Sequence, residues 1–291
     1  MRSEAEQTFV APATLEEALD ALSSNRLRVV AGGTDLVVAA RSGKTPLPAG
    51  LLAIHQLREL ETITRSDQGL HVGALVPHAM LEASDEVRAH YTALSDACAL
   101  VGSPATRSFG TLGGNLCNAS PAAETSSPLI VLDAVAELRS SEGSREVQIR
   151  DFCVGPGRTV LREDELLTEV RIPQTPARAG SAYVRLEYRR AMEIAVVGAA
   201  AFVALTEDGT VERASVSLTA VGPRPLPVDE INGQLAGAKP GPQSLAAAAE
   251  LAAAVAQPID DVRGSGEYRS AMVPVITRRA LEAAVRRAEA G

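Results

Sequence analysis

Residues 110–124 read GTLGGNLCNASPAAE, a stretch in which very little side chain covers the backbone. Gly113 and Gly114 are adjacent, with Thr111 before them and Asn115 after them. Glycine has no Cβ, so the N–H groups of such a pair stay open to a ligand and can hold a phosphate without any Lys or Arg. The stretch therefore predicts a glycine turn whose backbone contacts phosphate.

An earlier stretch repeats this arrangement. Residues 29–36 read VVAGGTDL, in which an apolar strand over residues 27–31 runs into Gly32 and Gly33. Thr34 then caps a helix that ends at Gly43, and a helix N-terminus adds a partial positive charge. Two such turns can grip the two phosphates of one dinucleotide from opposite sides. Neither turn has the GxGxxG or P-loop pattern, and either one alone is also compatible with an ordinary tight turn.

Charge and composition exclude several classes of function. The chain has 291 residues, 46% of them hydrophobic, with a net charge of −8 and a pI of about 5.2, so we expect no nucleic-acid partner. No apolar run is long enough for a signal peptide or a membrane span, which predicts a cytoplasmic protein without membrane insertion. Cys98, Cys117 and Cys153 have neither disulfide nor metal-cluster spacing and are expected to be reduced thiols. The four histidines show no metal-ligand spacing either.

The predicted elements indicate an α+β fold in two domains. Residues 14–23 combine the N-cap Thr14 with an apolar stripe at helical spacing, which predicts a short amphipathic helix. Short apolar runs then alternate with turns up to Pro173. The proline-rich segment 173–180 is the expected boundary, which gives domains 1–177 and 178–291, the first with subdomains of about 1–57 and 58–177.

The second domain is predicted to contain both strands and helices. Strands are expected over residues 183–190, 195–205 and 212–221, followed by an alanine-rich helix near 244–256. A terminal helix is expected from about Val275, with an apolar face that includes Leu281.

Several single residues allow two interpretations each. The Glu124 carboxylate can accept hydrogen bonds from cofactor hydroxyls or a ring N–H, or it can be a solvated acid before a helix over 125–134. Cys117 taken singly is a small buried hydrophobe, Leu167 a core residue and Arg185 a strand residue facing a surface acid. The order of these four residues within one pattern along the chain favours a role for them in binding a cofactor.

Taken together, these segments resemble a known family. The two glycine stretches are followed by FCVGPGRTVLREDELLTEVRIP (152–173), YVRLEYRRAMEIAVVGAA (183–200) and YRSAMVPVITRRALEAA (268–284). In this order, and nearly end to end, the set is similar to the FAD-binding medium subunit of the molybdenum hydroxylases. That family includes the CO dehydrogenase flavoprotein and the flavin domain of xanthine dehydrogenase.

The resemblance implies a two-part FAD-binding domain of the vanillyl-alcohol oxidase and p-cresol methylhydroxylase (PCMH) type, followed by a smaller C-terminal α+β lobe like that of the CO dehydrogenase flavoprotein. It implies pyrophosphate contacts along both glycine stretches and flavin contacts beyond them. The implied cofactor-binding residues are Ala31, Gly32, Gly33, Thr34, Asp35, Leu36, Thr111, Gly113, Gly114, Asn115, Cys117, Ser120, Glu124, Leu167 and Arg185.

Three positions depart from the family pattern. Glu124 stands where relatives have Asp, so a direct flavin contact would be longer or water-mediated. Arg185 stands where relatives often have Lys, which exchanges a compact ammonium for a planar fork. Glu193 also replaces Asp and is interpreted as structural.

By the same resemblance, the chain is an oxidoreductase subunit that transfers electrons. Non-covalent FAD would collect electrons from the [2Fe–2S] clusters of a small subunit, after a molybdopterin large subunit has oxidised the substrate, and would pass them to NAD, a quinone or oxygen. Relatives of this type form a dimer of heterotrimers. The alternatives are a stand-alone FAD-dependent oxidoreductase or cyclase, and a binding protein that has lost its flavin. The sequence itself contains no cluster ligands and no acid–base pair, which leaves the redox chemistry to the cofactor.

Overall fold

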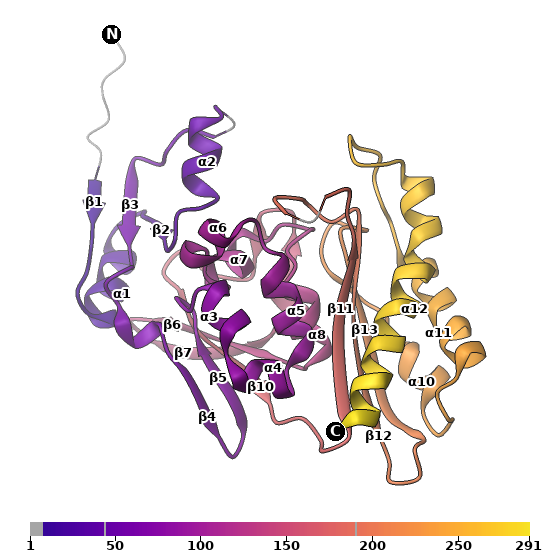
Figure 1. Cartoon of the computed structure of the whole chain (residues 1–291). Coiled ribbons are helices and arrows are strands. Elements are labelled where there is room, and N and C mark those ends of the chain that lie inside the picture. Colours follow the sequence, from indigo (N-terminus) through magenta and orange to yellow (C-terminus); the bar gives the residue numbers. More distant parts are fainter. Residues whose placement is uncertain (1–7, 44, 190) are drawn as a thin grey trace.

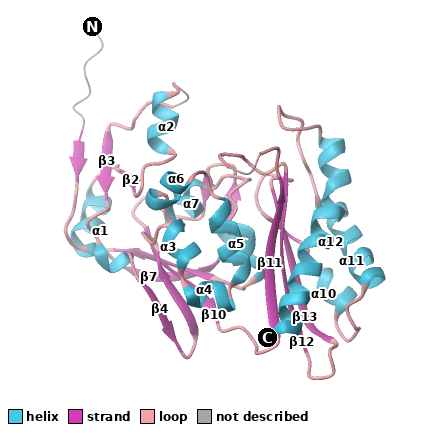
Figure 2. Cartoon of the chain, viewed as in Figure 1, coloured by secondary structure: helices cyan, strands magenta, loops and turns pink. Residues whose placement is uncertain are grey.

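The computed structural model describes residues 8–43, 45–189 and 191–291. Three main sheets follow one another along the chain, and helices lie between and beside them (Figures 1 and 2). The chain thus mixes helices and strands in an α+β arrangement, as predicted. The last sheet begins at Ala179; the domain boundary at residues 177/178 stays a prediction.

The N-terminal unit is a small parallel sheet with two helices. Its strands, in the order β1-β3-β2, are β1 (Thr8–Val10), β3 (Gly50–Ala53) and β2 (Arg28–Val30). Helix α1 (Leu15–Ser24) matches the predicted helix: the Thr14 hydroxyl accepts a hydrogen bond from the Glu17 N–H at 3.2 Å. Its apolar stripe is buried against this sheet. Helix α2 (Leu36–Arg41) follows β2 after the first glycine pair and has no buried residue.

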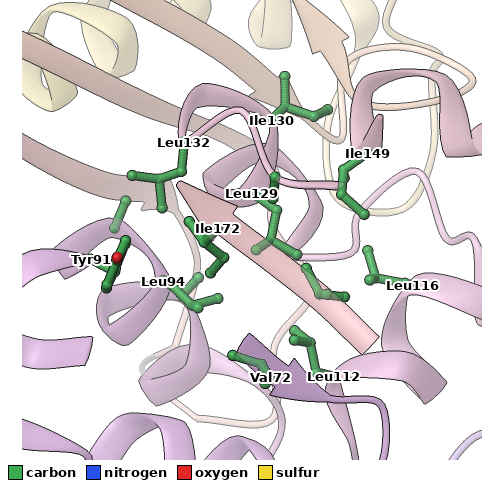
Figure 3. Close-up of a cluster of buried hydrophobic side chains, with 14 of the residues drawn as sticks. Val72, Tyr91, Leu94, Leu112, Leu116, Leu129, Ile130, Leu132, Ile149 and Ile172 are labelled. Atoms are coloured by element: carbon green, nitrogen blue, oxygen red, sulfur yellow. The ribbon is translucent and has the colours of Figure 1, made fainter. Parts of the chain in front are cut away.

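The central unit is a five-stranded antiparallel sheet covered by short helices. Its strands, in the order β4-β5-β10-β6-β7, are β4 (Ile63–Ser66), β5 (Gly69–Gly73), β10 (Leu166–Pro173), β6 (Val135–Ser140) and β7 (Gly143–Gln148). The helices are α3 (His78–Ala83), α4 (Asp85–His90), α5 (Thr92–Leu100), α6 (Pro104–Phe109), α7 (Leu112–Asn118), α8 (Ser126–Val131) and α9 (Ile149–Phe152), with a 3-10 turn, η1 (Arg58–Leu60), and the strand pair β8 (Cys153–Gly155) and β9 (Arg158–Thr159). Figure 3 shows the core between them, in which Leu112 and Leu116 of α7 face the region of Val72 and Ile172.

The C-terminal unit is an antiparallel sheet backed by helices. Its strands are β11 (Ala179–Leu186), β12 (Val197–Leu205), β13 (Val211–Thr219) and β14 (Leu226–Pro227). The helices are α10 (Ile231–Leu235), α11 (Pro242–Val255) and α12 (Gly266–Ala290). In Figure 1, α12 runs along one face of the sheet while α5 and α8 lie at the other.

Burial on both faces explains the composition of the central strand of this sheet. Every residue of β12, VGAAAFVAL, is buried. Phe202 belongs to the core of the central unit, whereas its neighbour Val203 belongs to the core under α11 and α12. At one edge, Arg287 of α12 donates to both carboxylate oxygens of Asp96 on α5, at 2.6 and 3.0 Å. The C-terminal sheet is therefore held firmly against the central unit, which fixes the side chains of β11 that face it.

Two predicted boundaries in this unit are wrong. The terminal helix begins at Gly266 rather than near Val275, because the Ser265 hydroxyl caps it by accepting from the Tyr268 N–H at 3.1 Å, and the helix runs through Pro274. The strand expected over 183–190 ends at Leu186; residue 190 lies outside the described residues.

Candidate functional site

The first glycine stretch forms the loop between β2 and α2. Gly33 has φ of +70°, a left-handed conformation in which a side chain is strained. In the part of the chain that the structure describes, the backbone N–H groups of Gly32, Gly33, Thr34 and Asp35 donate to no protein acceptor. The loop thus leaves four consecutive N–H groups without an acceptor in the described structure; that they contact phosphate stays a prediction.

The second glycine stretch is not a turn. Gly113 and Gly114 lie in the first turn of α7, and the Thr111 hydroxyl caps this helix by accepting from the Gly114 N–H at 3.0 Å. The Gly113 N–H donates to the Ala74 carbonyl at 2.9 Å, and the Asn115 N–H to the Thr111 carbonyl at 2.9 Å. These backbone donors are already used within the protein, so the expectation of a second open glycine turn is wrong. The sequence does contain the signal, since Thr111 is a favourable N-cap residue.

The glycines of the second stretch instead allow close packing. A Cβ on Gly113 would lie 2.7 Å from the Cβ and carbonyl oxygen of Ala74. The open donor on this side is the Asn115 side-chain amide, whose oxygen accepts from the Thr125 hydroxyl at 2.6 Å. That hydrogen bond fixes which end of the amide is left to meet a ligand.

The two stretches meet in space. A Cβ built on Gly32 would lie only 1.8 Å from the Phe109 carbonyl oxygen, so the first loop touches the backbone just before Thr111. A Cβ on Gly114 would lie 3.9 Å from the Ala31 Cβ, and one on Gly110 would lie 3.5 Å from the Thr34 hydroxyl. Segments about 80 residues apart therefore form one site, and Gly32 is the point at which only glycine fits.

A buried ion cluster lies beyond the end of α7. Arg185 on β11 donates from Nη1 to Glu124 Oε1 at 2.6 Å and to the Leu100 carbonyl at 3.1 Å, and from Nε to Glu187 Oε2 at 2.6 Å. Its side chain is 1% exposed. Glu124 is buried as well, so the interpretations of a solvated Glu124 and of Arg185 facing a surface acid are both wrong.

Burial controls protonation within this cluster. It raises the pKa of Glu124 to about 7, although Arg185 acts in the opposite direction. Tyr183, two residues before Arg185 on the same face of β11, has a buried hydroxyl without a hydrogen-bond partner among the described residues. Sequence reasoning missed Tyr183 and Glu187. The two-residue period of β11 places Tyr183 on the face of Arg185, and Glu187 follows directly after the end of that strand at Leu186.

The other predicted residues occupy varied surroundings. Cys117 on α7 is half-buried, and burial raises the pKa of its thiol to about 12. The Ser120 hydroxyl accepts from the Ala122 N–H at 3.2 Å in the loop after α7. Leu167 on β10 lies in the hydrophobic core, and Leu36 is the half-buried first residue of α2. Glu193 forms local contacts with the Ile194 N–H and Arg189.

A buried histidine, His78, contacts the backbone at the start of the second glycine stretch. His78 on α3 donates its backbone N–H to the Gly110 carbonyl at 3.0 Å, and its Nδ1 lies 3.7 Å from Cys98 Sγ. Burial and the nearby Arg107 lower the pKa of His78 to about 4, so it is neutral above that pH.

This shift predicts a pH-dependent loss of stability. Between pH 6.5 and 4 the unfolded chain protonates His78 while the folded chain does not, so the free energy of unfolding falls by up to about 3 kcal/mol. Denaturant titrations across this range should show a shallower pH dependence for His78→Gln than for the wild type. The matched control is His90→Gln, at an exposed histidine. Equal slopes for His78→Gln and the wild type would contradict the prediction.

Comparison with known proteins identifies the chain. Residues 4–175 match the model of the FAD binding domain in molybdopterin dehydrogenase, and residues 182–284 match the CO dehydrogenase flavoprotein C-terminal domain. The chain belongs to the FAD-binding medium subunits of the molybdenum hydroxylases. This medium subunit is an oxidoreductase flavoprotein with FAD as its cofactor, and its two-part fold is the predicted one.

Individual relatives extend the match over almost the whole medium subunit. It is 36% identical over 236 residues to the nicotinate dehydrogenase FAD-subunit of Eubacterium barkeri, covering 79% of each chain. It is 31% identical to the 6-hydroxypseudooxynicotine dehydrogenase complex subunit alpha of Paenarthrobacter nicotinovorans, covering 96% and 95%. A structure of carbon monoxide dehydrogenase from Hydrogenophaga pseudoflava superposes with a TM-score of 0.92 at 29% identity, covering 97% and 98%.

The described residues form neither a metal site nor a membrane-spanning helix. Within residues 8–43, 45–189 and 191–291, no three His, Cys, Asp or Glu side chains come together as a metal site. In the same ranges no helix has the length and apolarity needed to cross a membrane.

Proposed function

We propose that the loop 31–35 and the start of α7 hold the diphosphate of FAD between them. The observation that carries the proposal is the row of N–H groups at residues 32–35, which have no acceptor among the described residues and belong to a loop that lies against residues 109–114. A diphosphate supplies the anionic oxygens that such donors bind best. On the α7 side of the diphosphate, the Asn115 side-chain amide would donate a hydrogen bond. Thr111, Gly113 and Gly114 would lie beside the diphosphate at the start of that helix.

The remaining predicted residues extend from this cradle. In the proposal, Ala31, Asp35 and Leu36 flank the diphosphate, and Cys117 and Ser120 line the path along the cofactor. Leu167, Glu124 and Arg185 belong to the flavin end. Because Arg185 is held between Glu124 and Glu187, it presents a fixed guanidinium rather than a mobile charge. A binding protein that has lost flavin would have no use for four open donors, so we do not pursue that alternative.

The proposed role in the assembly is electron transfer. FAD, when bound, supplies the ability to accept two electrons and return them singly or in pairs. The chain's own residues bind and orient it. Several relatives are named as a medium chain or as a subunit of a complex, which supports partner chains here too. We propose a [2Fe–2S] small subunit as electron donor, a molybdopterin large subunit that oxidises the substrate, and a dimer of heterotrimers that works in the cytoplasm. NAD, a quinone or oxygen would be the electron acceptor.

Cofactor analysis of the purified chain tests this function. We expect yellow protein with about one FAD per chain and no iron or molybdenum. Acid precipitation should leave all flavin in the supernatant, because the proposed cradle holds FAD through hydrogen bonds and burial keeps the Cys117 thiol, with its pKa raised to about 12, in the unreactive protonated form. Flavin that stays with the pellet would contradict non-covalent binding. A colourless protein that takes up no added FAD would contradict the function itself.

A further inference from the structure

The buried cluster of Glu124, Arg185 and Glu187 contains two carboxyl groups but only one positively charged side chain. Two carboxylates contact one guanidinium at 2.6 Å each. If both were ionised, the cluster would carry a net charge of −1 where little water reaches it. A buried charge without a partner is costly, and protonation of one acid is the ordinary way to remove it.

The other titratable groups near Glu124 do not offset this excess. Tyr183 faces it from β11 and Cys98 from α5. Burial raises the pKa of both groups, so each is neutral near pH 7. The Leu100 carbonyl occupies a further donor position of Arg185 and adds no positive charge. The single guanidinium is therefore the only compensating charge among the described residues that contact the two acids.

Exposure distinguishes the two acids. The Glu187 side chain is 20% exposed and that of Glu124 is 10%. Arg185 donates Nε to Glu187 Oε2 at 2.6 Å, with Nη2 lying 2.5 Å from the same oxygen without a hydrogen bond, and it donates Nη1 to Glu124 Oε1 at 2.6 Å. Each acid thus accepts one hydrogen bond from Arg185, and the charged form is favoured at Glu187 because the better solvated acid loses less hydration.

We propose that this cluster stores a single proton at neutral pH, with Glu124 carrying the proton and Glu187 forming the charged pair with Arg185. Glu187 is then a positioning residue that controls the protonation of Glu124 through their shared cation. The proton store is a property of the chain. Its use by a bound flavin rests on the proposed function, because reduced flavin takes up protons together with electrons.

Infrared titration of the full-length chain, with uniform ¹³C-glutamate labelling to identify the band, tests the store. In the wild type we expect a protonated-carboxyl band that disappears as the pH rises through about 7. Glu124→Gln should remove this band. In Glu187→Gln the pH at which half of the Glu124 band is lost should fall by about one pH unit or more, because Glu124 is then the only carboxylate paired with Arg185. The exposed control Glu207→Gln should leave the titration unchanged.

Three results of this titration would contradict the proposal. No such band near neutral pH, its persistence in Glu124→Gln, or an unchanged or raised midpoint in Glu187→Gln would overturn the proposal. A merely structural Glu187 would change stability without moving this midpoint.

The link to flavin has its own readout. A plot of flavin midpoint potential against pH should bend near pH 7 in the wild type and lose the bend in Glu124→Gln; the same bend in both proteins would overturn the link. If the chain fails to bind FAD, the carboxyl titration still appears as described. If the proton store is absent, FAD binds but no titrating band is found, so the two failures are distinguishable.

Discussion

Gly32→Ala is expected to lower the affinity for FAD by a hundredfold or more while the protein stays folded. The added Cβ would lie 1.8 Å from the Phe109 carbonyl oxygen. Because the position of each atom is fixed by the backbone, no side-chain rotation can relieve the clash, and the loop 31–35 has to move away from residues 109–114. Losing two charge-assisted hydrogen bonds to the diphosphate costs about 3 kcal/mol or more, which corresponds to roughly a hundredfold in the dissociation constant. Flavin fluorescence titration of the apoprotein measures the affinity, and circular dichroism measures folding.

Two matched variants make this result interpretable. Gly233→Ala adds the same methyl group where no atom outside the backbone of its own helix and its chain neighbours lies within 4 Å, and it should bind FAD as the wild type does. Gly114→Val projects a side chain between the two stretches, where the nearest atoms are the Thr111 hydroxyl at 2.9 Å and the Ala31 Cβ at 3.9 Å. It should also lose FAD, and it covers the case in which Gly32→Ala does not fold. Wild-type affinity in folded Gly32→Ala and Gly114→Val would show that the cofactor does not lie there.

Arg185→Met is expected to lower the free energy of unfolding by about 3–5 kcal/mol at pH 8. The substitution keeps an unbranched chain of similar reach but leaves Glu124 and Glu187 without their shared cation in a buried site. The loss should shrink as the pH falls, because protonation of the two acids removes the uncompensated charge. Denaturant unfolding at several pH values measures both effects.

An exposed ion pair supplies the control for this prediction. Arg150→Met breaks a contact with Asp229 in which both side chains are largely exposed, so a change of less than about 1 kcal/mol is expected. Adding Glu124→Gln to Arg185→Met should restore part of the stability, since one of the stranded carboxylates is then neutral. Equal losses for Arg185→Met and Arg150→Met, or no recovery in the double variant, would show that the cluster is not a buried charge network.

From the local sequence we could locate the two glycine stretches, but we predicted the conformation of only the first one correctly. The order strand, Gly32-Gly33, helix was correct because each part is decided by near neighbours: Val29 and Val30 favour a strand, and Gly33 supplies a positive φ. The predicted Thr34 cap is wrong, since the N-cap residue of α2 is Asp35 and its side chain makes no capping hydrogen bond. Gly113-Gly114 was misread as a turn, since a glycine pair favours turns unless capping and packing override it. Here the Thr111 cap and the close approach to Ala74 stabilise a helix at this position.

Contacts between distant segments were beyond local reasoning. Nothing in the chain near Glu124 indicates that its partner is Arg185, 61 residues later, because that pairing depends on how β11 packs against α5 and on where α7 ends. The resemblance placed both residues near the cofactor but did not pair them. The helix expected from about Val275 begins nine residues earlier, at Gly266, because the Ser265 cap starts it there and Pro274 is accommodated inside it.

The most direct test of the central claim is a crystal structure of the chain with FAD bound. Diphosphate oxygens should accept hydrogen bonds from the N–H groups of residues 32–35 and lie between that loop and the first turn of α7, with no Lys or Arg side chain in contact. A diphosphate located elsewhere, or one neutralised by a cationic side chain while those four N–H groups face solvent, would contradict the account.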